Sequence, residues 1–284
     1  GDMYRISPIK GNAFTVNGDH VLTLVKTTQG AKNGKWYPST RGGEIIDVSV
    51  REWTGWSNWK KHLWKLFRAA AQFPAASSSL PLDPYFLGAL LGDGAIQKEV
   101  SVFKPDPEIA NLCAVEAEKH GLGITVIDAG TSSVGYRMTA GLAGCGRGKT
   151  NPIADKLRML GVYGLDGGTK FIPHEYKAGS HDDRLAVLAG LLDTDGHMRH
   201  AGYDFISKSK RLADDAAFVA RSLGFGVTQL TCEKGCQTGA VGIYHRVSIY
   251  GDCDLIPCRI RRKQSPARGQ IKNHLRTGFA ADRI

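Results

Sequence analysis

The 284-residue chain has no long apolar run, no dense set of cysteines and fewer acidic than basic residues. The absence of a long apolar run excludes a membrane-spanning helix, and no signal peptide is visible at the start of the chain. The 27 Asp and Glu residues are outnumbered by 37 Lys and Arg residues, which leaves a net charge of +10. We therefore expect an intracellular protein without a membrane partner, whose charge favours a polyanion such as nucleic acid.

The six cysteines are too dispersed for a disulfide framework, which favours a reducing compartment. Four of them allow a thiolate zinc site, but the spacings in CEKGC and CDLIPC are looser than paired two-residue knuckles. We expect buried or incidental thiols instead. The four are Cys232, Cys236, Cys253 and Cys258, and the other two are Cys113 and Cys145.

One apolar, small-residue segment occurs twice. FLGALLGDG at residues 86–94 returns in altered form as LAGLLDTDG at residues 188–196, and each copy ends in Asp-Gly. Glycine and alanine one helical turn apart allow two helix backbones to approach closely. The segments are too short to span a bilayer, so we expect them to pack at Gly88 and Gly190 inside a protein core.

This packing would bring Asp93 and Asp195 together at the negative ends of their helices. Such a pair is unfavourable unless cations neutralise it, and hard divalent ions such as Mg²⁺ prefer oxygen ligands. A single Asp-Gly pair is also a common turn, but two copies in a matching repeat indicate a metal site that acts on a phosphodiester. We assign Gly92 and Thr194, which precede the acids, to the same site, and expect Mg²⁺, Mn²⁺ or Ca²⁺ there.

The segments that follow the two motifs have the same order. Each motif helix is followed by a strand, a second helix and an alternating strand. Two copies of helix, hairpin, helix and hairpin predict a pseudo-twofold domain from one chain. The strand, helix and strand ranges are 96–103, 107–120 and 134–139 in the first copy, and 203–207, 211–222 and 244–250 in the second.

Both motif helices have marked starts. Asp83 followed by Pro84 predicts an N-cap and a proline at the first helical position. Ser180 with Asp183 three residues later resembles a capping box with Asp in place of Glu.

The first part of the chain has a different composition. Residues 1–50 contain short β-branched runs separated by turn residues, and residues 75–84 have the composition of a linker. Residues 51–70 hold four of the five tryptophans, interleaved with lysines. Their spacing predicts an amphipathic helix that closes the first domain, and contact with a DNA backbone is the alternative. The residues near helical spacing are Trp56, Trp59, Leu63 and Phe67.

The two motifs resemble those of the LAGLIDADG homing endonucleases. NPIADKLRMLGV and TKFIPHEY before the second motif, and FISKSKRLADDAAFVARSLG after it, resemble intein-encoded members such as those of fungal vacuolar-ATPase inteins. The resemblance covers about residues 84–263. It implies an α+β fold with a pseudo-twofold endonuclease domain of two αββαββα-type repeats. It also implies a monomer whose two four-stranded saddles lie in the major groove, and cleavage of both strands of a long asymmetric DNA target to leave 3′ overhangs.

The resemblance also assigns catalytic residues. The two motif acids match the catalytic metal-binding acids of the family. Lys170 in TKFIP and Lys263 in RIRRKQ match lysines near the scissile phosphates, the alternatives being a solvated lysine and one member of a basic run. We take Gly92 to stand in the first copy where Asp193 stands in the second, at a position that does not bind metal in the family.

DNA contacts are expected on the strands 95–103, 132–139, 198–207 and 242–250. Arg bound to guanine and Gln bound to adenine are the favoured base contacts. The base-reading candidates are Gln97, Lys98, Arg137, Arg199, His200, His245 and Arg246. The basic tail, expected to contact phosphates or form a solvated face, comprises Arg259, Arg261, Arg262, Arg268, Lys272 and Arg276.

The segment MYRI…FTVNGDHVLTL resembles the intein splicing domain, or Hint domain. Its Asn-x-x-His block falls on Asn17 and His20, with Asp19 where threonine is usual, and the histidine assists the first acyl shift in that family. HLRTGFAADRI at the other end resembles the return of the chain to this domain. We expect a smaller all-β Hint-like domain at 1–80, completed by about 264–284, and an endonuclease domain at 81–263 with repeats at about 84–150 and 151–263.

We expect no splicing by this chain. Gly1 stands where a nucleophilic Cys or Ser belongs, and Ile284 follows Asp-Arg where a His-Asn pair belongs. We expect the first domain to be a trimmed or relic scaffold, and an added DNA-contacting surface is a further role open to it. Two alternatives remain: a splicing element in a longer chain, and a non-catalytic DNA- or RNA-binding LAGLIDADG protein. Proteins of the last kind often lack one acid, whereas both are present here.

Overall fold

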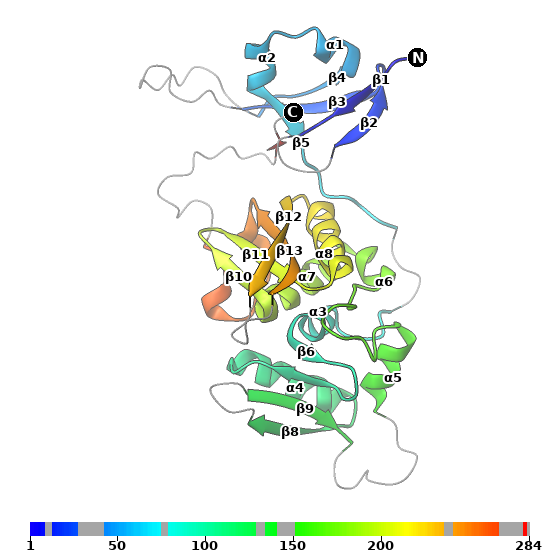
Figure 1. Cartoon of the computed structure of the whole chain (residues 1–284), viewed down its shortest axis with the longest axis vertical. Coiled ribbons are helices and arrows are strands. Elements are labelled where there is room, and N and C mark those ends of the chain that lie inside the picture. The colour runs from blue at the N-terminus through cyan, green and yellow to red at the C-terminus, as the bar shows by residue number, and fades with distance from the viewer. Residues whose placement is uncertain are drawn as a thin grey trace.

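Two hydrophobic cores organise the protein (Figure 1). The computed structural model describes residues 1–8, 13–27, 43–74, 79–128, 134–140, 151–235, 241–266 and 281–282. The smaller core lies within residues 6–64, and the larger core extends from residue 82 to residue 260. The described chain is therefore a mixture of helices and strands with a small N-terminal part and a larger second part.

The N-terminal part contains two antiparallel sheets. One pairs β1 with β2, and the other has the order β14-β5-β3-β4. Alternate side chains of the central strand, Leu22 and Leu24, are buried because they face the core, which Trp64 also enters. The strands are β1 (Met3–Ile6), β2 (Phe14–Asn17), β3 (Val21–Lys26), β4 (Ile45–Ser49), β5 (Trp64–Phe67) and β14 (Ala281–Asp282).

The single helix predicted within residues 51–70 is wrong. The segment forms α1 (Val50–Thr54), α2 (Asn58–Leu63) and then β5. Ser49 and Ser57 each cap a new helix by accepting a backbone N–H, so two short helices form where the tryptophan spacing suggested one. The chain becomes extended at Trp64, which packs into the core against Trp56 with ring centroids 6.2 Å apart.

The larger part consists of two halves with the same element order (Figure 1). Their four-stranded sheets have the orders β6-β7-β9-β8 and β10-β11-β13-β12, which are equivalent, as the internal repeat predicts. The first half contains α3 (Pro84–Asp93), β6 (Gly94–Ala95), β7 (Ser101–Phe103), α4 (Pro107–Lys119), β8 (Gly123–Asp128) and β9 (Val134–Thr139). The second contains α7 (His181–Asp195), β10 (Gly196–Arg199), β11 (Gly202–Ser207), α8 (Lys210–Ser222), β12 (Gly226–Gly235) and β13 (Val241–Tyr250).

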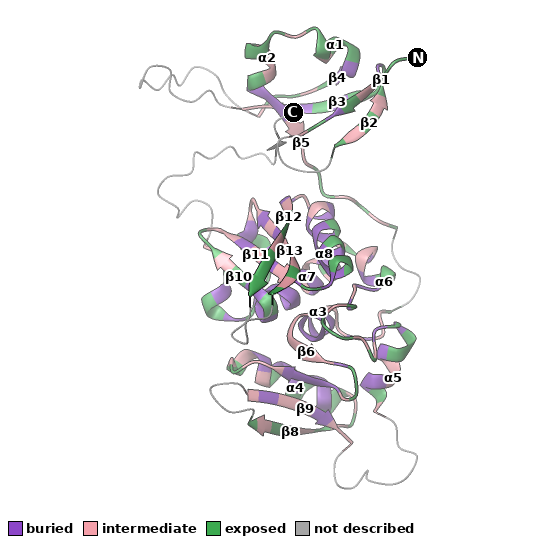
Figure 2. Ribbon diagram, viewed as in Figure 1, coloured by how far each residue is buried: buried purple, intermediate pink, exposed green. Residues whose placement is uncertain are grey.

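Short elements follow each half. Between the halves lie α5 (Pro152–Met159) and α6 (His174–Lys177), and after the second half come the 3₁₀ turns η2 (Cys253–Leu255) and η3 (Arg261–Lys263). The helices pack on one face of each sheet, and Figure 2 shows the buried residues of the helices and strands in purple. The other face of each sheet is not covered by these helices.

The strand predicted at 96–103 is interrupted. Gly94 pairs with Val102 and Ala95 with Ser101, so the residues between them turn the chain back. Gln97 and Lys98 therefore lie in an exposed bend and not on a strand.

The predicted starts of the motif helices are confirmed. The Asp83 carboxylate accepts a hydrogen bond from the backbone N–H of Phe86 at 2.9 Å, and Pro84 begins α3. Ser180 and Asp183 form the complete capping box at the start of α7. Both helices therefore begin where local sequence signals place them.

The segment that leaves the N-terminal part is attached to the second half. The N–H of Ala71 donates to the carbonyl oxygen of Ser222, and the Phe73 and Phe218 rings stack with centroids 6.2 Å apart. The fully buried guanidinium of Arg184 donates to the carbonyl oxygens of Ala71 and Ser222. These contacts fix residues 71–73 on α7 and α8.

Cys113, Cys253 and Cys258 are buried, and Cys232 is partly exposed. Cys145 and Cys236 lie outside the described residues. Within the parts of the chain that the structure describes, no helix combines the length and apolar character needed to cross a bilayer.

Candidate active site

The two motif helices, α3 and α7, pack with their backbones in contact. A Cβ atom built on Gly88 would lie 2.2 Å from the carbonyl oxygen of Val187, and one on Gly190 would lie 2.1 Å from that of Tyr85. Real Cβ atoms do not approach so closely, so only glycine fits at either position. The predicted packing at the two glycines is confirmed, and it joins the two halves into one core.

The close packing brings the two motif acids to the same end of the helix pair. A Cβ atom on Gly92 would lie 3.5 Å from the Cβ of Asp195, which is the last residue of α7. Asp195 has solvent access, yet surrounding protein and the charge of Asp93 raise the pKa of its carboxyl. The Asp93 side chain is 41 % exposed. Two carboxylates thus share one partly open centre.

Lys170 caps the C-terminal end of the first motif helix. Its side chain is buried, and its Nζ donates to the carbonyl oxygens of Leu90 at 3.0 Å and Gly94 at 2.7 Å. The Leu90 carbonyl oxygen lies in the last turn of α3 and also accepts the backbone N–H of Gly94, the residue after the helix. A positive charge is favourable at this end of a helix. Lys170 therefore is not the solvated surface lysine that was its alternative.

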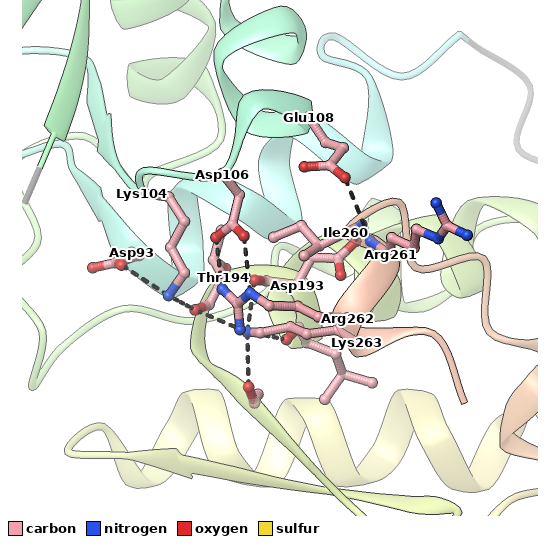
Figure 3. A network of polar contacts seen from close by, with 12 residues as sticks. Asp93, Lys104, Asp106, Glu108, Asp193, Thr194, Ile260, Arg261, Arg262 and Lys263 are labelled. Carbon is pink, nitrogen blue, oxygen red and sulfur yellow. Dashed lines mark hydrogen bonds and ion pairs between the residues drawn. The ribbon is translucent and has the colours of Figure 1, made fainter. Parts of the chain in front are cut away.

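Lys263 makes the equivalent contacts in the second half (Figure 3). Its buried Nζ donates to the carbonyl oxygens of Leu192 at 3.0 Å and Gly196 at 2.8 Å, the counterparts of Leu90 and Gly94. It also lies 2.7 Å from the carbonyl oxygen of Asp193. Two lysines far from the motifs in sequence thus hold the two acid-bearing helix ends in the same way.

Burial lowers the pKa of both ammonium groups to about 8. For Lys170 the negative charges of Asp195 and Asp93 oppose this fall. For Lys263 the positive charges of Lys104 and Arg262 add to it. Both lysines are therefore cations at neutral pH that can release a proton more easily than ordinary lysines.

No pattern in the sequence indicated a third lysine in this centre. Lys104 follows β7, and its Nζ lies 3.5 Å from a carboxylate oxygen of Asp93 and donates to the carbonyl oxygen of Thr194 (Figure 3). One ammonium group thus joins the ends of both motif helices. The contact with Thr194 spans 90 residues of sequence, so spacing could not reveal it.

Asp193 also belongs to the centre, and its assigned counterpart is corrected. Counting back from Asp93 and Asp195, Asp193 corresponds to Leu91, whereas Gly92 corresponds to Thr194. The buried Asp193 carboxylate accepts hydrogen bonds from the Tyr85 hydroxyl at 2.6 Å and from the backbone N–H of Arg259 at 2.5 Å.

These contacts give Asp193 a structural role. Burial raises the pKa of its carboxyl, and the hydrogen bonds from Tyr85 and from the backbone oppose that change. The acid thereby fixes the segment before Lys263 against α7 and α3.

Gly92 and Thr194 face each other across the helix pair. A Cβ atom on Gly92 would lie 2.1 Å from the Thr194 hydroxyl, so a side chain does not fit there. The Thr194 hydroxyl donates to the carbonyl oxygen of Gly190 at 2.8 Å, and its own carbonyl oxygen faces Lys104. The contribution of Thr194 to the centre is thus a backbone oxygen.

The outer face of the second sheet carries several of the predicted DNA-contacting residues. Phe205 and Val247 pair across β11 and β13 and are buried, so their neighbours Ile206 and Arg246 face away from the helices. By the same alternation, Arg199 on β10 lies on this outer face. His200 follows in the hairpin turn with a left-handed φ of 57° and is exposed.

His245 is the exception among these residues. It pairs with Ser207, which is buried, and it lies two residues before the buried Val247 on the same face of β13. It therefore lies on the helix-covered side, and the structure does not support a base-reading role for it.

In the first sheet, Arg137 pairs with Ser101 and Thr125 and alternates with the buried Met138. It thus lies on the outer face, where its guanidinium forms an ion pair with Glu99 at 2.6 Å. A DNA contact by Arg137 would require this ion pair to open or to be shared. Gln97 and Lys98 lie next to it in the exposed bend.

The basic segment after η2 is only partly free. Arg262 forms two hydrogen bonds with Asp106, at 2.9 and 2.7 Å, and this pairing lowers the pKa of the Asp106 carboxyl (Figure 3). Arg261 is exposed, and its backbone N–H lies 3.5 Å from a Glu108 oxygen. Arg268, Lys272 and Arg276 lie outside the described residues.

A cavity of about 360 Å³ opens beside the first acid. Asp93, Lys170, Gln97 and Phe103 are among the residues that line it. A larger cavity of about 670 Å³ lies at the opposite ends of α3 and α7, near Asp83 and Ser180, and contains neither motif acid.

The oxygen atoms at the acid pair fit a hard divalent ion. Among the described residues, no three His, Cys, Asp or Glu side chains gather around one point. The available ligands are the Asp93 and Asp195 carboxylates and the Thr194 carbonyl oxygen, with mutual repulsion that raises the pKa of Asp195. Mg²⁺ binds through one or two carboxylates while keeping several waters, so this set suits it.

Asn17 and His20 are exposed in the N-terminal part. Asn17 ends β2, and its carbonyl oxygen accepts a hydrogen bond from the His20 N–H at 3.3 Å across a tight turn. The His20 ring lies edge-on to Phe14, with centroids 6.4 Å apart. The hydrogen bonds described for this turn join it to Val50 and Arg51 within the N-terminal part.

Comparison with known proteins finds similarity in the second half. Residues 182–255 match the model of a LAGLIDADG-like domain. The replicative DNA helicase DnaB of Mycobacterium intracellulare is 36% identical over 145 residues, which are 51% of this chain and 19% of the helicase. The chain thus spans less than a fifth of that relative.

Solved structures of I-DmoI are also similar. The complex of I-DmoI with DNA and Mn is 14% identical with a TM-score of 0.40, over 60% of this chain and 89% of that one. Mesophilic variants of the homing endonuclease I-DmoI are 14% identical with a TM-score of 0.40, over 60% and 83%. From α7 to η2, the chain is therefore similar to a LAGLIDADG-like domain.

Proposed function

We propose that this chain is a site-specific endonuclease that cleaves both strands of a long, asymmetric DNA target and leaves 3′ overhangs. One observation carries the proposal. The acids Asp93 and Asp195 meet at the ends of paired helices, and each helix end is held by an equivalent buried lysine. A duplicated acid-and-lysine centre suits a reaction carried out twice, once on each strand.

The acids and the Thr194 carbonyl oxygen would hold the divalent ion, together with the backbone of Gly92. When bound, such an ion supplies Lewis-acid polarisation of the scissile phosphate and makes a bound water more acidic. The cavity beside Asp93 gives this centre access to solvent and to a backbone phosphate.

We assign Lys170 and Lys263 a role in positioning the two acids. Their ammonium groups lie on the carbonyl oxygens at the negative helix ends, which offsets the field that would otherwise oppose two carboxylates there. They are therefore positioning residues that orient Asp93 and Asp195, and their charges oppose the rise in the pKa of the Asp195 carboxyl. Their charge also favours the approach of a phosphate.

DNA binding is assigned to the outer faces of the two sheets. Arg137, Arg199 and Arg246 lie on those faces, and the net charge of +10 provides the general attraction to a polyanion. Arg261, Gln97 and Lys98 add exposed polar groups nearby. Because both halves belong to one chain and share one core, a monomer presents both faces.

We further propose an intein origin for the chain. The 145-residue match occupies only 19% of a helicase, as expected for an element inserted in a host protein. In this view the N-terminal part, with Asn17 and His20, is a Hint-like scaffold without splicing activity. The DNA substrate would be intracellular.

The test is cleavage of a randomised duplex library in Mg²⁺, with EDTA as the control, followed by sequencing of the new ends. The wild-type chain should yield one long site with 3′ overhangs. Asp93→Asn and Asp195→Asn should each lower the cleavage rate by about 10³-fold or more while leaving gel-shift binding to that site intact. Asp182→Asn is the matched control, because this side chain lies on the same helix as Asp195 and is 97% exposed.

Two results would reject the proposal. Specific binding without cutting by the wild-type chain would indicate a non-catalytic nucleic-acid-binding protein. Loss of the native circular-dichroism spectrum in both Asn variants would mean that the acids serve the fold.

A further inference from the structure

The Lys104 ammonium group lies between the C-terminal ends of the two motif helices, beside a motif acid. It lies 3.5 Å from the Asp93 carboxylate and donates to the Thr194 carbonyl oxygen (Figure 3). Its side chain is only 19% exposed, so water screens these contacts weakly. The same two oxygens are among the ligands assigned above to a divalent ion.

The second half has no equivalent lysine. Val102 pairs with Gly94 and Phe205 with Gly196, which makes Lys104 and Ser207 counterparts, each two residues further along. The buried Ser207 hydroxyl accepts a hydrogen bond from the N–H of Ser209 at 3.0 Å. The ammonium group is therefore an addition to one half, whereas the capping lysines occur in both.

The Lys104 contact differs in kind from those of Lys170 and Lys263. The capping lysines donate to carbonyl oxygens behind the acids and are described with no carboxylate ion pair. Lys104 alone among these three is described in an ion pair with a motif acid. It thus stands on the side of the acids that a metal ion would approach.

We propose that Lys104 is a resident counter-cation that competes with a divalent ion for Asp93 and Thr194 and thereby sets the metal affinity of the DNA-free protein. This inference rests on the proposed function, because it assumes that the acids bind metal. An ammonium group and a divalent ion at the same oxygens repel each other strongly in a partly buried site. Metal binding must therefore displace Lys104 from Asp93.

Displacement gives the free protein a weak metal site and makes DNA a positive effector. A DNA phosphate offers the displaced ammonium group another anionic partner, so DNA binding and metal binding should strengthen each other. Removing the ammonium group should raise metal affinity in the absence of DNA and shrink the gain that DNA provides.

The test is an equilibrium titration of the DNA-free full chain with Mn²⁺, in which free Mn²⁺ is measured by electron paramagnetic resonance. Lys104→Met should bind Mn²⁺ about tenfold more tightly than wild type, the effect of losing one competing charge. Lys104→Arg, which keeps the charge, should stay close to wild type. Lys119→Met is the matched control, because Lys119 is paired with Glu116 on α4, away from the motif acids.

Unchanged or weaker Mn²⁺ binding by Lys104→Met with a native melting profile would overturn the inference. If that variant does not fold, Lys104→Gln repeats the test with a polar side chain of similar length. The proposed function fails separately: an Asp93→Asn and Asp195→Asn double variant that binds Mn²⁺ as wild type does would show that the acids hold no metal at all.

Discussion

The two halves of the larger part share their architecture and differ around the acids. Both have the same sheet order, the same close-packed glycine and the same lysine on the helix end. Around that frame, Leu91 in the first half is replaced by Asp193 in the second, and Lys104 by Ser207. The glycines and capping lysines at the helix backbones occur in both halves, whereas the side chains around the acids differ between the halves.

The sheets differ in reach as well. β8 and β9 have six residues each, whereas β12 and β13 have ten. A longer hairpin extends further along a bound surface, so the two outer faces present different lengths and side chains. A duplicated fold can thus bind an asymmetric partner without changing the centre at which the halves meet.

The shared glycine contact should be the most sensitive part of the comparison. Gly190→Val places branched carbon atoms where the Tyr85 carbonyl oxygen lies, 2.1 Å from the Cβ position. We expect a loss of more than about 4 kcal/mol in the free energy of unfolding, or no folded protein, because backbone cannot yield. Urea denaturation measures this. Gly167→Ala is the control, since no atom lies within 4 Å of its Cβ position, and equal stability of the two variants would contradict the prediction.

The two capping lysines provide the next test. Lys170→Met and Lys263→Met each remove the ammonium group that donates to the carbonyl oxygens at a helix end, so its positive charge no longer offsets the negative helix end beside the acids. We expect each to lower single-turnover cleavage by about 10²-fold and to do so to a similar extent. Rates that differ between the variants by more than about tenfold would show that the halves are not chemically equivalent.

Asp193 tests the part of the comparison in which the halves differ. Asp193→Leu imitates Leu91 of the first half but leaves the Tyr85 hydroxyl and the Arg259 N–H without an acceptor. We expect a loss of about 2 kcal/mol in stability. Asp193→Asn keeps an acceptor oxygen and should lose less. Thermal melts compare the two, and a harmless Leu substitution would mean that the acid is not a structural link.

The smallest expected effect is a pH dependence of stability. The folded pKa of Lys170 is about 8, below its ordinary value near 10.4, so the unfolded chain binds more protons between these values. Stability contributed by this group therefore rises as pH increases through that window and is constant below it. Relative to Lys170→Met, wild type should gain about 1 kcal/mol between about pH 7.5 and pH 9. A constant difference in urea melts would contradict the lowered pKa.

Local signals in the sequence predicted the elements that form the centre. Asp83-Pro84 and the Ser180 box mark the helix starts, and the small residues of both motifs predict the close packing. These features succeed because caps and glycine contacts act over a few residues. Local signals did not identify Lys170 and Lys263. Their assignment rests on the resemblance to a family and on the contacts described above.

Features that depend on long-range competition were not predictable. The tryptophan spacing at 51–70 is helical, but Trp64 enters the core and pairs with Lys26 of β3, so the segment leaves the helix there as β5. The side of the sheet on which His245 lies depends on its pairing with Ser207. Lys104 reaches Thr194 only because two halves of the chain fold together.

The position of the capping lysines has a consequence for how the chain divides. Each lysine follows the hairpins of its own half: Lys170 holds the helix end at Gly94, and Lys263 holds the one at Gly196. A unit that carries one acid together with its capping lysine therefore extends to Lys170. Under the proposed function, halves exchanged between related chains after Lys170 would each bring a complete set of groups for one strand, so new target combinations would need no change in these groups.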